Sequence, residues 1–377
     1  MVTQRIRDFF ATHRFEGPCL VVDLDVVREN YFNFEKALPQ SRIFYAIKAN
    51  PAPEILRLLT SLGSSFDAAS VAEIEMALKA GATPERISFG NTIKKERDIA
   101  HAFALGISLY AVDCVEEVEK IARAAPGARV FCRVLTDGEG AEWPLSRKFG
   151  CVPDMAVDVL RLAHQLGLQA YGVSFHVGSQ QTDLSAWDRA LSDAAVVFRR
   201  LEQEGISLKL VNLGGGFPTR YLKDVPTAQA YGTAVFDSLK KYFGNRIPET
   251  IIEPGRAMVG NAGVIRTEVI LISKKADNDN VRWVYLDVGK FNGLAETMDE
   301  AIRYPIETPH DDKPMEPCIL AGPTCDSMDV LYEKTPYPLP LSLTVGDELL
   351  IRGTGAYTTT YASVAFNGFE PLRSYVI

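Results

Sequence analysis

Lys48 stands directly after a short apolar run, residues 43–47, which is typical of a buried strand. Ala-Asn-Pro then ends the strand, because Pro51 donates no backbone hydrogen bond and restricts the residue before it. A lysine at the end of a buried strand is partly desolvated, which lowers the pKa of its amine and suits it to form a Schiff base. The alternative is a lysine whose stem covers apolar surface while its ammonium reaches water. This stretch alone leaves both interpretations open.

A second group of residues has the chemistry of a phosphate site. Three consecutive glycines, Gly214 to Gly216, follow the strand predicted at 208–213. Without side chains, their backbone N–H groups can approach an anion closely. Arg256 and Ser179, each near the end of another predicted strand, would complete a phosphate cup. A glycine run by itself is more often only a flexible turn.

Glu253 and His176 also lie at predicted strand ends. Glu253 precedes the phosphate arginine by three residues, so it would lie deeper in the same site. A carboxylate beside a pyridine nitrogen keeps that nitrogen protonated and the ring electron-poor. The imidazole of His176 could lie flat against such a ring. Alternatively, it is an ordinary hydrogen-bonded core histidine.

These residues are positioned by a regular alternation of short apolar strands and helices between residues 25 and 260. This rhythm is typical of a parallel sheet, and about eight repeats predict an α/β fold with a closed (β/α)8 TIM-like barrel. The loop at 136–150 is rich in glycine and charge. The predicted strands are 43–47, 65–70, 86–89, 109–112, 128–135, 171–177, 208–213 and 250–253. The predicted helices are 26–38, 53–62, 71–80, 94–105, 115–125, 154–166, 184–204 and 228–242.

The residue pattern changes after Gly260, where β-rich segments are separated by Gly, Pro and Asp and helix signals are scarce. We therefore expect a second, C-terminal all-β domain built from residues 1–24 and 261–377. The strand at 20–22 should pair with it, because both segments flank the barrel in sequence. The predicted strands of this domain are 262–274, 281–288, 317–320, 348–352 and the C-terminal tail.

The bulk composition narrows the class of protein. The chain has 377 residues, of which 47% are hydrophobic and 23% charged, and a formal net charge of −8. It has no long run of one charge sign, so we expect no nucleic-acid or membrane partner. No apolar stretch reaches the length of a membrane span and no secretory signal is visible, so a cytoplasmic protein is predicted. Six cysteines without C-x-x-C spacing indicate neither a disulfide framework nor a metal site.

Six ordered motifs extend this interpretation: YAIKAN, SFHVGSQ, NLGGGF, EPGR, GPTCDSMD, and GAYT with FNGF. In this order and at these separations they resemble ornithine decarboxylase, and more broadly the pyridoxal-phosphate (PLP) decarboxylases with the alanine racemase fold (fold type III). The resemblance covers residues 17 to 371, almost the whole chain. It implies PLP as cofactor and decarboxylation of a basic L-amino acid, L-ornithine to putrescine and CO2 or L-lysine to cadaverine, in polyamine biosynthesis.

The resemblance also implies a role for each matching residue. Lys48 would form the Schiff base, His176 would stack on the cofactor ring, and Glu253 would pair with its nitrogen. Cys325 resembles the thiol that protonates the carbanion, and Asp326 and Asp299 resemble carboxylates that bind the distal amine. The other residues implied at the cofactor are Asp67, Glu73, Arg133, Ser179, Gly215, Gly216, Gly255, Arg256 and Tyr357.

The same resemblance implies a homodimer with shared active sites, in which Cys325 and Asp326 reach the partner's barrel. Three rivals are weighed. A racemase of this fold resembles a pattern with arginine beside the pyridine nitrogen, which Glu253 disfavours. Diaminopimelate decarboxylase resembles a pattern with glutamate after the cysteine, whereas Asp326 stands here. A non-catalytic homologue should have broken cofactor residues.

Overall fold

The computed structural model describes residues 2–144 and 147–377. It divides into two compact units. Among the described residues, the barrel unit comprises 28–144, 147–218 and 225–258, and the β unit comprises 2–27, 219–224 and 259–377. The short segment 219–224 lies inside the predicted barrel sequence but packs with the β unit.

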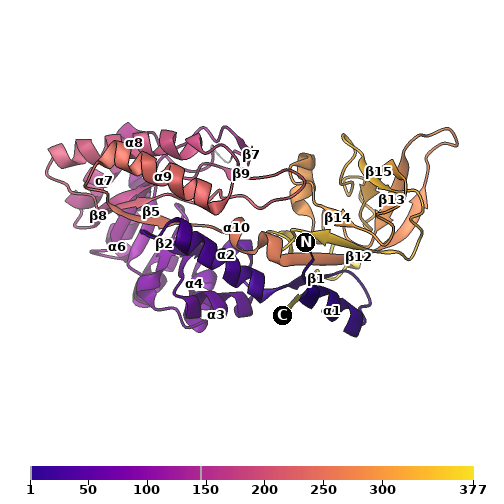
Figure 1. Cartoon of the computed structure of the whole chain (residues 1–377). Coiled ribbons are helices and arrows are strands. Elements are labelled where there is room, and N and C mark those ends of the chain that lie inside the picture. The colour runs from indigo at the N-terminus through magenta and orange to yellow at the C-terminus, as the bar shows by residue number, and fades with distance from the viewer. Residues whose placement is uncertain (1, 145–146) are drawn as a thin grey trace. The chain divides into compact units, whose positions relative to one another are not determined.

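The barrel unit contains a closed barrel of parallel strands, so the predicted (β/α)8 fold is confirmed (Figure 1). The circle closes where the last strand, β11, pairs with the first, β2. We call the edge formed by the carboxyl ends of these strands, with the loops that follow them, the barrel mouth. The strands, in order around the barrel, are β2 (Ser41–Ala46), β3 (Ser65–Ala68), β4 (Ile87–Phe89), β5 (Leu109–Val112), β6 (Arg129–Arg133), β8 (Gln169–Ser174), β10 (Leu210–Asn212) and β11 (Glu249–Ile252).

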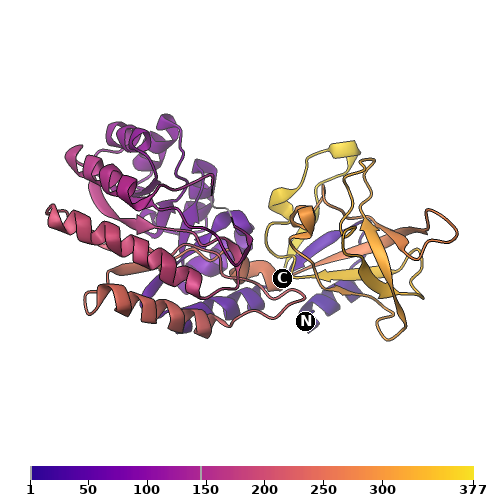
Figure 2. The same ribbon diagram turned by 90° about the horizontal axis from the view of Figure 1, so that it is seen from above.

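Helices surround the strands, and α7, α8 and α9 lie side by side along one flank (Figures 1 and 2). Local signals set their ends. Ser70 caps α4 by accepting a hydrogen bond from the Glu73 N–H at 3.3 Å, and the Glu73 carboxylate accepts from the Ala69 N–H at 2.6 Å. The barrel helices are α2 (Leu24–Ala37), α3 (Pro53–Leu62), α4 (Val71–Lys79), α5 (Glu96–Ala104), α6 (Val115–Ala124), α7 (Pro153–Gln165), α8 (Ser185–Gln203), α9 (Ala228–Phe243) and the short, unpredicted α10 (Arg256–Val259).

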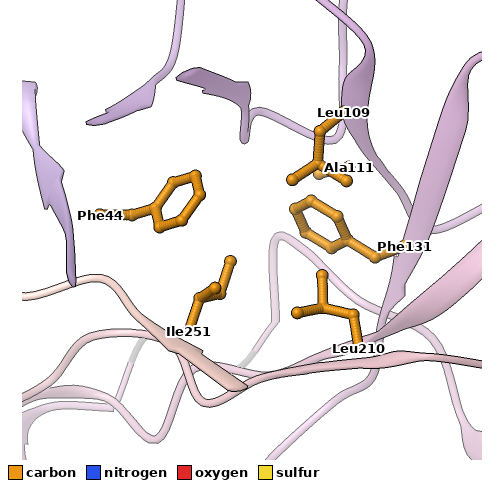
Figure 3. Packing of buried hydrophobic residues seen from close by; sticks show 6 residues of the cluster. All are labelled: Phe44, Leu109, Ala111, Phe131, Leu210 and Ile251. Carbon is orange, nitrogen blue, oxygen red and sulfur yellow. The ribbon is translucent and has the colours of Figure 1, made fainter. Parts of the chain in front are cut away.

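The interior of the barrel is filled by apolar side chains from β2, β5, β6, β10 and β11 (Figure 3). Phe44 and Phe131 contribute the largest rings, and Leu210 and Ile251 pack beside them. Truncating a buried phenylalanine to alanine costs about 3–5 kcal/mol of unfolding free energy. The barrel is therefore a rigid support for the groups at its mouth.

Two strands at the barrel mouth correct the prediction. Residues 136–150 were expected to be a loop, but they contain β7 (Ala141–Trp143), which pairs antiparallel with β9 (Ser179–Gln181). The predicted strand 171–177 ends at Ser174, before β9 begins. Residues 145 and 146 of the predicted loop lie outside the described residues.

The β unit contains a sheet in the order β14-β17-β12-β13-β15-β16, with β1 and β18 attached. The predicted pairing of residues 20–22 is confirmed, because β1 pairs with both β12 and β18. The strands are β1 (Cys19–Val22), β12 (Gly263–Ser273), β13 (Arg282–Leu286), β14 (Ile306–Glu307), β15 (Met315–Ala321), β16 (Tyr337–Pro340), β17 (Glu348–Arg352) and β18 (Arg373–Val376).

The prediction of an all-β second domain is incomplete. An N-terminal helix, α1 (Gln4–Thr12), starts at the Thr3 cap and packs Ile6 against Val21 and Val264 of the sheet. The strands β14 and β16 were not predicted either. Over residues 2–144 and 147–377, no helix combines the length and hydropathy that crossing a membrane requires.

Candidate active site

Lys48 lies at the barrel mouth in a short 3-10 turn, η1 (Ile47–Ala49), immediately after β2. Its neighbours Ile47 and Ala49 are buried, but Lys48 itself is exposed. The expectation of a desolvated lysine is therefore wrong, because the turn carries the residue beyond the buried part of the strand. Lys48 also lies close enough to Glu253, Asp67 and His176 to act on their charge.

Glu253 follows β11, and two contacts tie it to the end of β10. Its backbone N–H donates to the Gly214 carbonyl at 2.8 Å, and its Oε1 accepts from Asn212 Nδ2 at 2.5 Å. Burial, and next the nearby carboxylate of Asp67, raise the pKa of Glu253 to about 8. The Asn212 hydrogen bond and the cations of Lys48 and Arg133 act in the opposite direction. A cationic ring nitrogen placed here would favour the ionised carboxylate.

Asp67, at the end of β3, is buried, and burial raises its pKa although Lys48 and Arg133 lower it. Arg133, the last residue of β6, stacks over the ring of Phe149 at 5.3 Å. Its positive charge favours the ionised form of Asp67. Glu73 has the structural role already described at the start of α4. Its pKa is raised, by burial first.

His176 follows β8 and is held in a neutral form. Its Nδ1 accepts a hydrogen bond from the Gly178 N–H at 3.1 Å, so this nitrogen carries no proton. Burial lowers the pKa of the imidazole well below its ordinary value, and the nearby cations Arg133 and Lys48 add to this effect. A neutral ring with a fixed tautomer is suited to lie against an aromatic cofactor.

The glycine run forms a turn that admits no side chains. Gly214 has φ +66° and Gly216 has φ +100°. A Cβ on Gly214 would lie 2.0 Å from the Phe175 carbonyl oxygen, and one on Gly216 would lie 2.4 Å from that of Gly178. A Cβ on Gly215 would lie 2.7 Å from the Glu253 carbonyl oxygen. The three glycines therefore follow from close packing and not from flexibility.

The remaining phosphate candidates of the barrel unit lie together. Arg256 Nη2 donates to Ser179 Oγ at 3.2 Å, which joins the start of α10 to β9. Arg256 is buried, and so is the preceding Gly255. The sequence placed Ser179 and Arg256 in one cup, and their side chains do meet.

The residues of the barrel mouth fit a phosphorylated pyridine aldehyde. The glycine turn and the Arg256–Ser179 pair suit a phosphate, the exposed Lys48 suits an aldehyde, and Glu253 suits a ring nitrogen. Within the described part of the chain, Asp67 Oδ1 is a buried oxygen without a hydrogen-bond partner. Such an atom is costly unless a donor reaches it. This donor set matches the chemistry of the expected cofactor.

The four other predicted residues belong to the β unit. Cys325 is exposed, and its N–H donates to Asn367 Oδ1 at 2.8 Å. Asp326 accepts from the Met328 N–H at 2.8 Å. Asp299 has φ +52° and accepts from Lys334 Nζ at 3.3 Å. Tyr357 also has a positive φ, +55°, and its ring lies 5.4 Å from that of Tyr361.

Sequence reasoning gave no role to several residues that shape the site. Asn212 stands in the quoted glycine motif, yet its contact with Glu253 needs two separate strands to meet. Gly90 makes room for Asp67, since a Cβ there would lie 1.8 Å from the carboxylate. The only signal for Gly90 was a glycine directly after a predicted strand. Asn367, in the quoted FNGF motif, holds the Cys325 loop.

A closed parallel barrel whose mouth combines these groups defines the class of barrel proteins that hold a phosphorylated pyridine cofactor. The model of one family, described as pyridoxal-dependent decarboxylase, pyridoxal binding domain, matches residues 24–260. The chain belongs to this family, and its cofactor is pyridoxal phosphate.

Individual relatives cover nearly the whole chain. The lysine/ornithine decarboxylase of Selenomonas ruminantium is 35% identical over 358 residues, which are 94% of this chain and 88% of the relative. Antizyme inhibitor 2 of Xenopus laevis is 35% identical over 365 residues, 93% of this chain and 78% of the relative. The crystal structure of lysine/ornithine decarboxylase from Vibrio vulnificus complexed with cadaverine is 28% identical, covers 100% of both chains and has a TM-score of 0.89.

Proposed function

We propose that this protein decarboxylates a basic L-amino acid: L-ornithine to putrescine and CO2, with L-lysine to cadaverine as a second reaction. Its place would be polyamine biosynthesis in the cytoplasm, as a homodimer with shared active sites. The observation that carries the proposal is the position of Glu253, whose carboxylate is held by Asn212 and whose N–H bonds the glycine turn at the barrel mouth. Two relatives whose names state lysine/ornithine decarboxylation, one of them complexed with cadaverine, support the substrate class.

Glu253 supports decarboxylation more than racemisation. When bound, the cofactor supplies an electron sink for the Cα–carboxylate bond as CO2 leaves, and it is strongest when the pyridine nitrogen is protonated. Glu253 is the group that would hold this proton in place. An arginine at this position would leave the nitrogen unprotonated, and the sink would then be weaker.

The remaining steps are assigned to this chain's own side chains. Lys48 would hold the aldehyde carbon of the cofactor and exchange it with the substrate amine. Cys325 would give a proton to Cα after CO2 has left, and Asp326 and Asp299 would bind the distal ammonium. Because an ammonium is costly to desolvate without a partner, these carboxylates would select basic side chains.

A non-catalytic regulator is the second candidate, favoured by the 35% identity to a relative named antizyme inhibitor 2. This chain retains Lys48, His176, Gly216, Glu253 and Arg256. A protein that had lost catalysis would be under no constraint to keep this whole set. The retained cofactor groups therefore favour the enzyme.

The test is a substrate comparison. Purified protein with PLP is given ornithine, lysine, arginine or diaminopimelate separately, and released CO2 and amine are measured. We expect turnover of ornithine and lysine, with ornithine preferred, because one methylene is worth only about 1–3 kcal/mol. The Lys48→Ala variant serves as the blank. Turnover of diaminopimelate alone, or of no substrate, would contradict the proposal.

The shared site is tested with hybrid dimers. Lys48→Ala and Cys325→Ala proteins, each inactive, are mixed under conditions of subunit exchange. If each site takes Lys48 from one chain and Cys325 from the other, half of the dimers carry one intact site, and roughly a quarter of the wild-type activity returns. Exchange without recovered activity would show that each site is built within one chain.

A further inference from the structure

Asn212, the last residue of β10, makes two hydrogen bonds through one buried side-chain amide. Its Oδ1 accepts from the Gly214 N–H at 2.9 Å. A backbone N–H can only donate, so the amide oxygen must face Gly214. The orientation of the amide is therefore fixed, and its Nδ2 must face Glu253.

This amide fixes the carboxylate of Glu253 as well. Nδ2 donates to Oε1 at 2.5 Å, while the Glu253 N–H donates to the Gly214 carbonyl at 2.8 Å. Both the backbone and the side chain of Glu253 are therefore hydrogen-bonded to the turn that begins at Asn212. With Oε1 held, the second oxygen is the acceptor that remains for a ring nitrogen.

The charges around Glu253 explain why a donor is needed there. Asp67 from β3 opposes ionisation of Glu253, as does burial, whereas Lys48 from η1 and Arg133 from β6 favour it. A charge-neutral donor stabilises the ionised carboxylate without repelling a cationic ring nitrogen, which an added lysine or arginine would do. An asparagine also cannot lose its donor by titration.

We infer that Asn212 is a positioning residue: it orients the Glu253 carboxylate toward the ring nitrogen of the cofactor and favours its ionised form once that cation is bound. The inference rests on the proposed role of Glu253. Asn212 would act through Glu253, because its two side-chain hydrogen bonds go to Glu253 and to the Gly214 N–H.

The test compares two ligands that differ in one ring atom. Pyridoxal phosphate has the ring nitrogen, whereas 1-deazapyridoxal phosphate has carbon in its place and keeps the aldehyde and phosphate. Full-length apoprotein is titrated with each ligand, and the ratio of the two dissociation constants is measured. This ratio reports the ring-nitrogen interaction and needs no substrate turnover.

Three variants and one control are compared. Glu253→Gln removes the proposed partner of the nitrogen. Asn212→Leu removes both amide contacts, and Asn212→Ser is too short to reach Glu253 but keeps a hydroxyl acceptor for the Gly214 N–H. Asn292→Leu is the matched control, because Asn292 is also buried, accepts from the Gly289 N–H at 2.6 Å and donates to the Asp287 carbonyl at 3.2 Å.

A hydrogen bond to a charged group supports an expected change of roughly ten- to a hundredfold. Asn212→Ser and Asn212→Leu should weaken pyridoxal phosphate by about this factor and leave 1-deazapyridoxal phosphate within about threefold of wild type. Asn292→Leu should not change the ratio. Equal weakening of both ligands would mean that Asn212 supports only the glycine turn, and no weakening would mean that Glu253 needs no support; either result overturns the inference.

The Glu253→Gln variant separates this failure from failure of the proposed function. If Glu253→Gln changes the ratio but the Asn212 variants do not, the role of Asn212 is wrong and that of Glu253 stands. If Glu253→Gln leaves the ratio unchanged, Glu253 does not interact with the ring nitrogen. The argument that Glu253 strengthens the electron sink is then wrong as well. Asn212→Ser keeps the test valid if Asn212→Leu does not fold.

Discussion

The two units present their candidate residues in different electrostatic settings. At the barrel mouth, Glu253, Asp67 and His176 act on one another or share the same cations, and burial shifts the pKa of each. In the β unit, Cys325 is exposed, and Asp299 pairs with Lys334 in an ion pair that is largely exposed. Burial is what makes the cofactor groups interdependent. Substitutions at the barrel mouth should therefore change several properties together, whereas those in the β unit should act singly.

The largest expected effect is at Lys48. Lys48→Ala should lower turnover by about a thousandfold or more, because the amine is proposed both to hold the cofactor and to exchange it with substrate. The measurement is kcat for ornithine, together with borohydride reduction of the wild-type holoenzyme and peptide mapping. The pyridoxyl group should be found on Lys48, and label on another lysine would refute the assignment.

A second lysine at the barrel mouth provides a contrast in stability. Lys94 is buried, donates to the Ala111 carbonyl at 2.6 Å and pairs with the buried Glu117 at 3.0 Å. Its pKa is lowered to about 8 by burial. Glu117→Ala leaves this ammonium unpaired, and we expect the unfolding free energy to fall by about 3–5 kcal/mol. Urea denaturation measures this.

The matched control is the exposed ion pair between Arg123 of α6 and Glu96 of α5, at 2.9 Å. Arg123→Ala should leave the unfolding free energy close to that of the wild type, because water screens the pair. If Glu117→Ala costs no more than Arg123→Ala, the buried Lys94 must lose its proton or gain a water molecule when its partner is removed. The double variant Lys94→Met with Glu117→Ala should recover part of the loss.

The barrel could be predicted from sequence because its strands are buried on both faces. Leu109–Val112 and Pro53–Leu62 were predicted with the same bounds that they have in the structure. The β7–β9 pair was not predictable in this way. Its strands have three residues each, stand among glycines and polar residues, and are defined by pairing between distant positions of the sequence, such as Trp143 with Ser179.

The site shows the same division. The glycine turn, Glu253 and Arg256 are adjacent to strong strand signals, so their convergence follows from the barrel. The exposure of Lys48 depends on one 3-10 turn, which apolar periodicity does not detect. The orientation of the Asn212 amide depends on the Gly214 N–H and the Glu253 carboxylate together. Only the folded structure brings these two partners to one side chain.

Glu253 also predicts a pH dependence of the apoprotein. Its pKa is about 8 in the fold against an ordinary value of 4.5, so between these values the folded chain keeps a proton that the unfolded chain has lost. Folding stability from this group should therefore fall as pH rises from about 5 to 8. Asp67, whose pKa is also raised, acts in the same direction.

We expect a loss of about 1–3 kcal/mol for the wild-type apoprotein between pH 5.5 and 7.5, measured by urea denaturation. Glu253→Gln cannot titrate and should remove part of this slope. An identical slope in the variant would show that Glu253 is ionised in the folded apoprotein, and the barrel mouth would then be less strongly coupled than its burial indicates.

The sharpest test of the contrast between the units concerns Asp326. Asp326→Asn keeps the Oδ1 acceptor for the Met328 N–H but removes the charge proposed to bind the distal ammonium. A charge-assisted hydrogen bond of this kind is worth about 1.5–3 kcal/mol, so kcat/KM for ornithine and lysine should fall roughly ten- to a hundredfold. The dissociation constant for pyridoxal phosphate should not change, because Asp326 has no part in the cofactor cluster of the barrel.

Asp312→Asn, at an exposed surface pair with Lys313, is the control. If Asp326→Asn stays within about a factor of two of wild type for both substrates, this carboxylate does not bind the amine and selectivity must arise elsewhere. If it instead weakens the cofactor, the coupling found at the barrel mouth extends to the β unit.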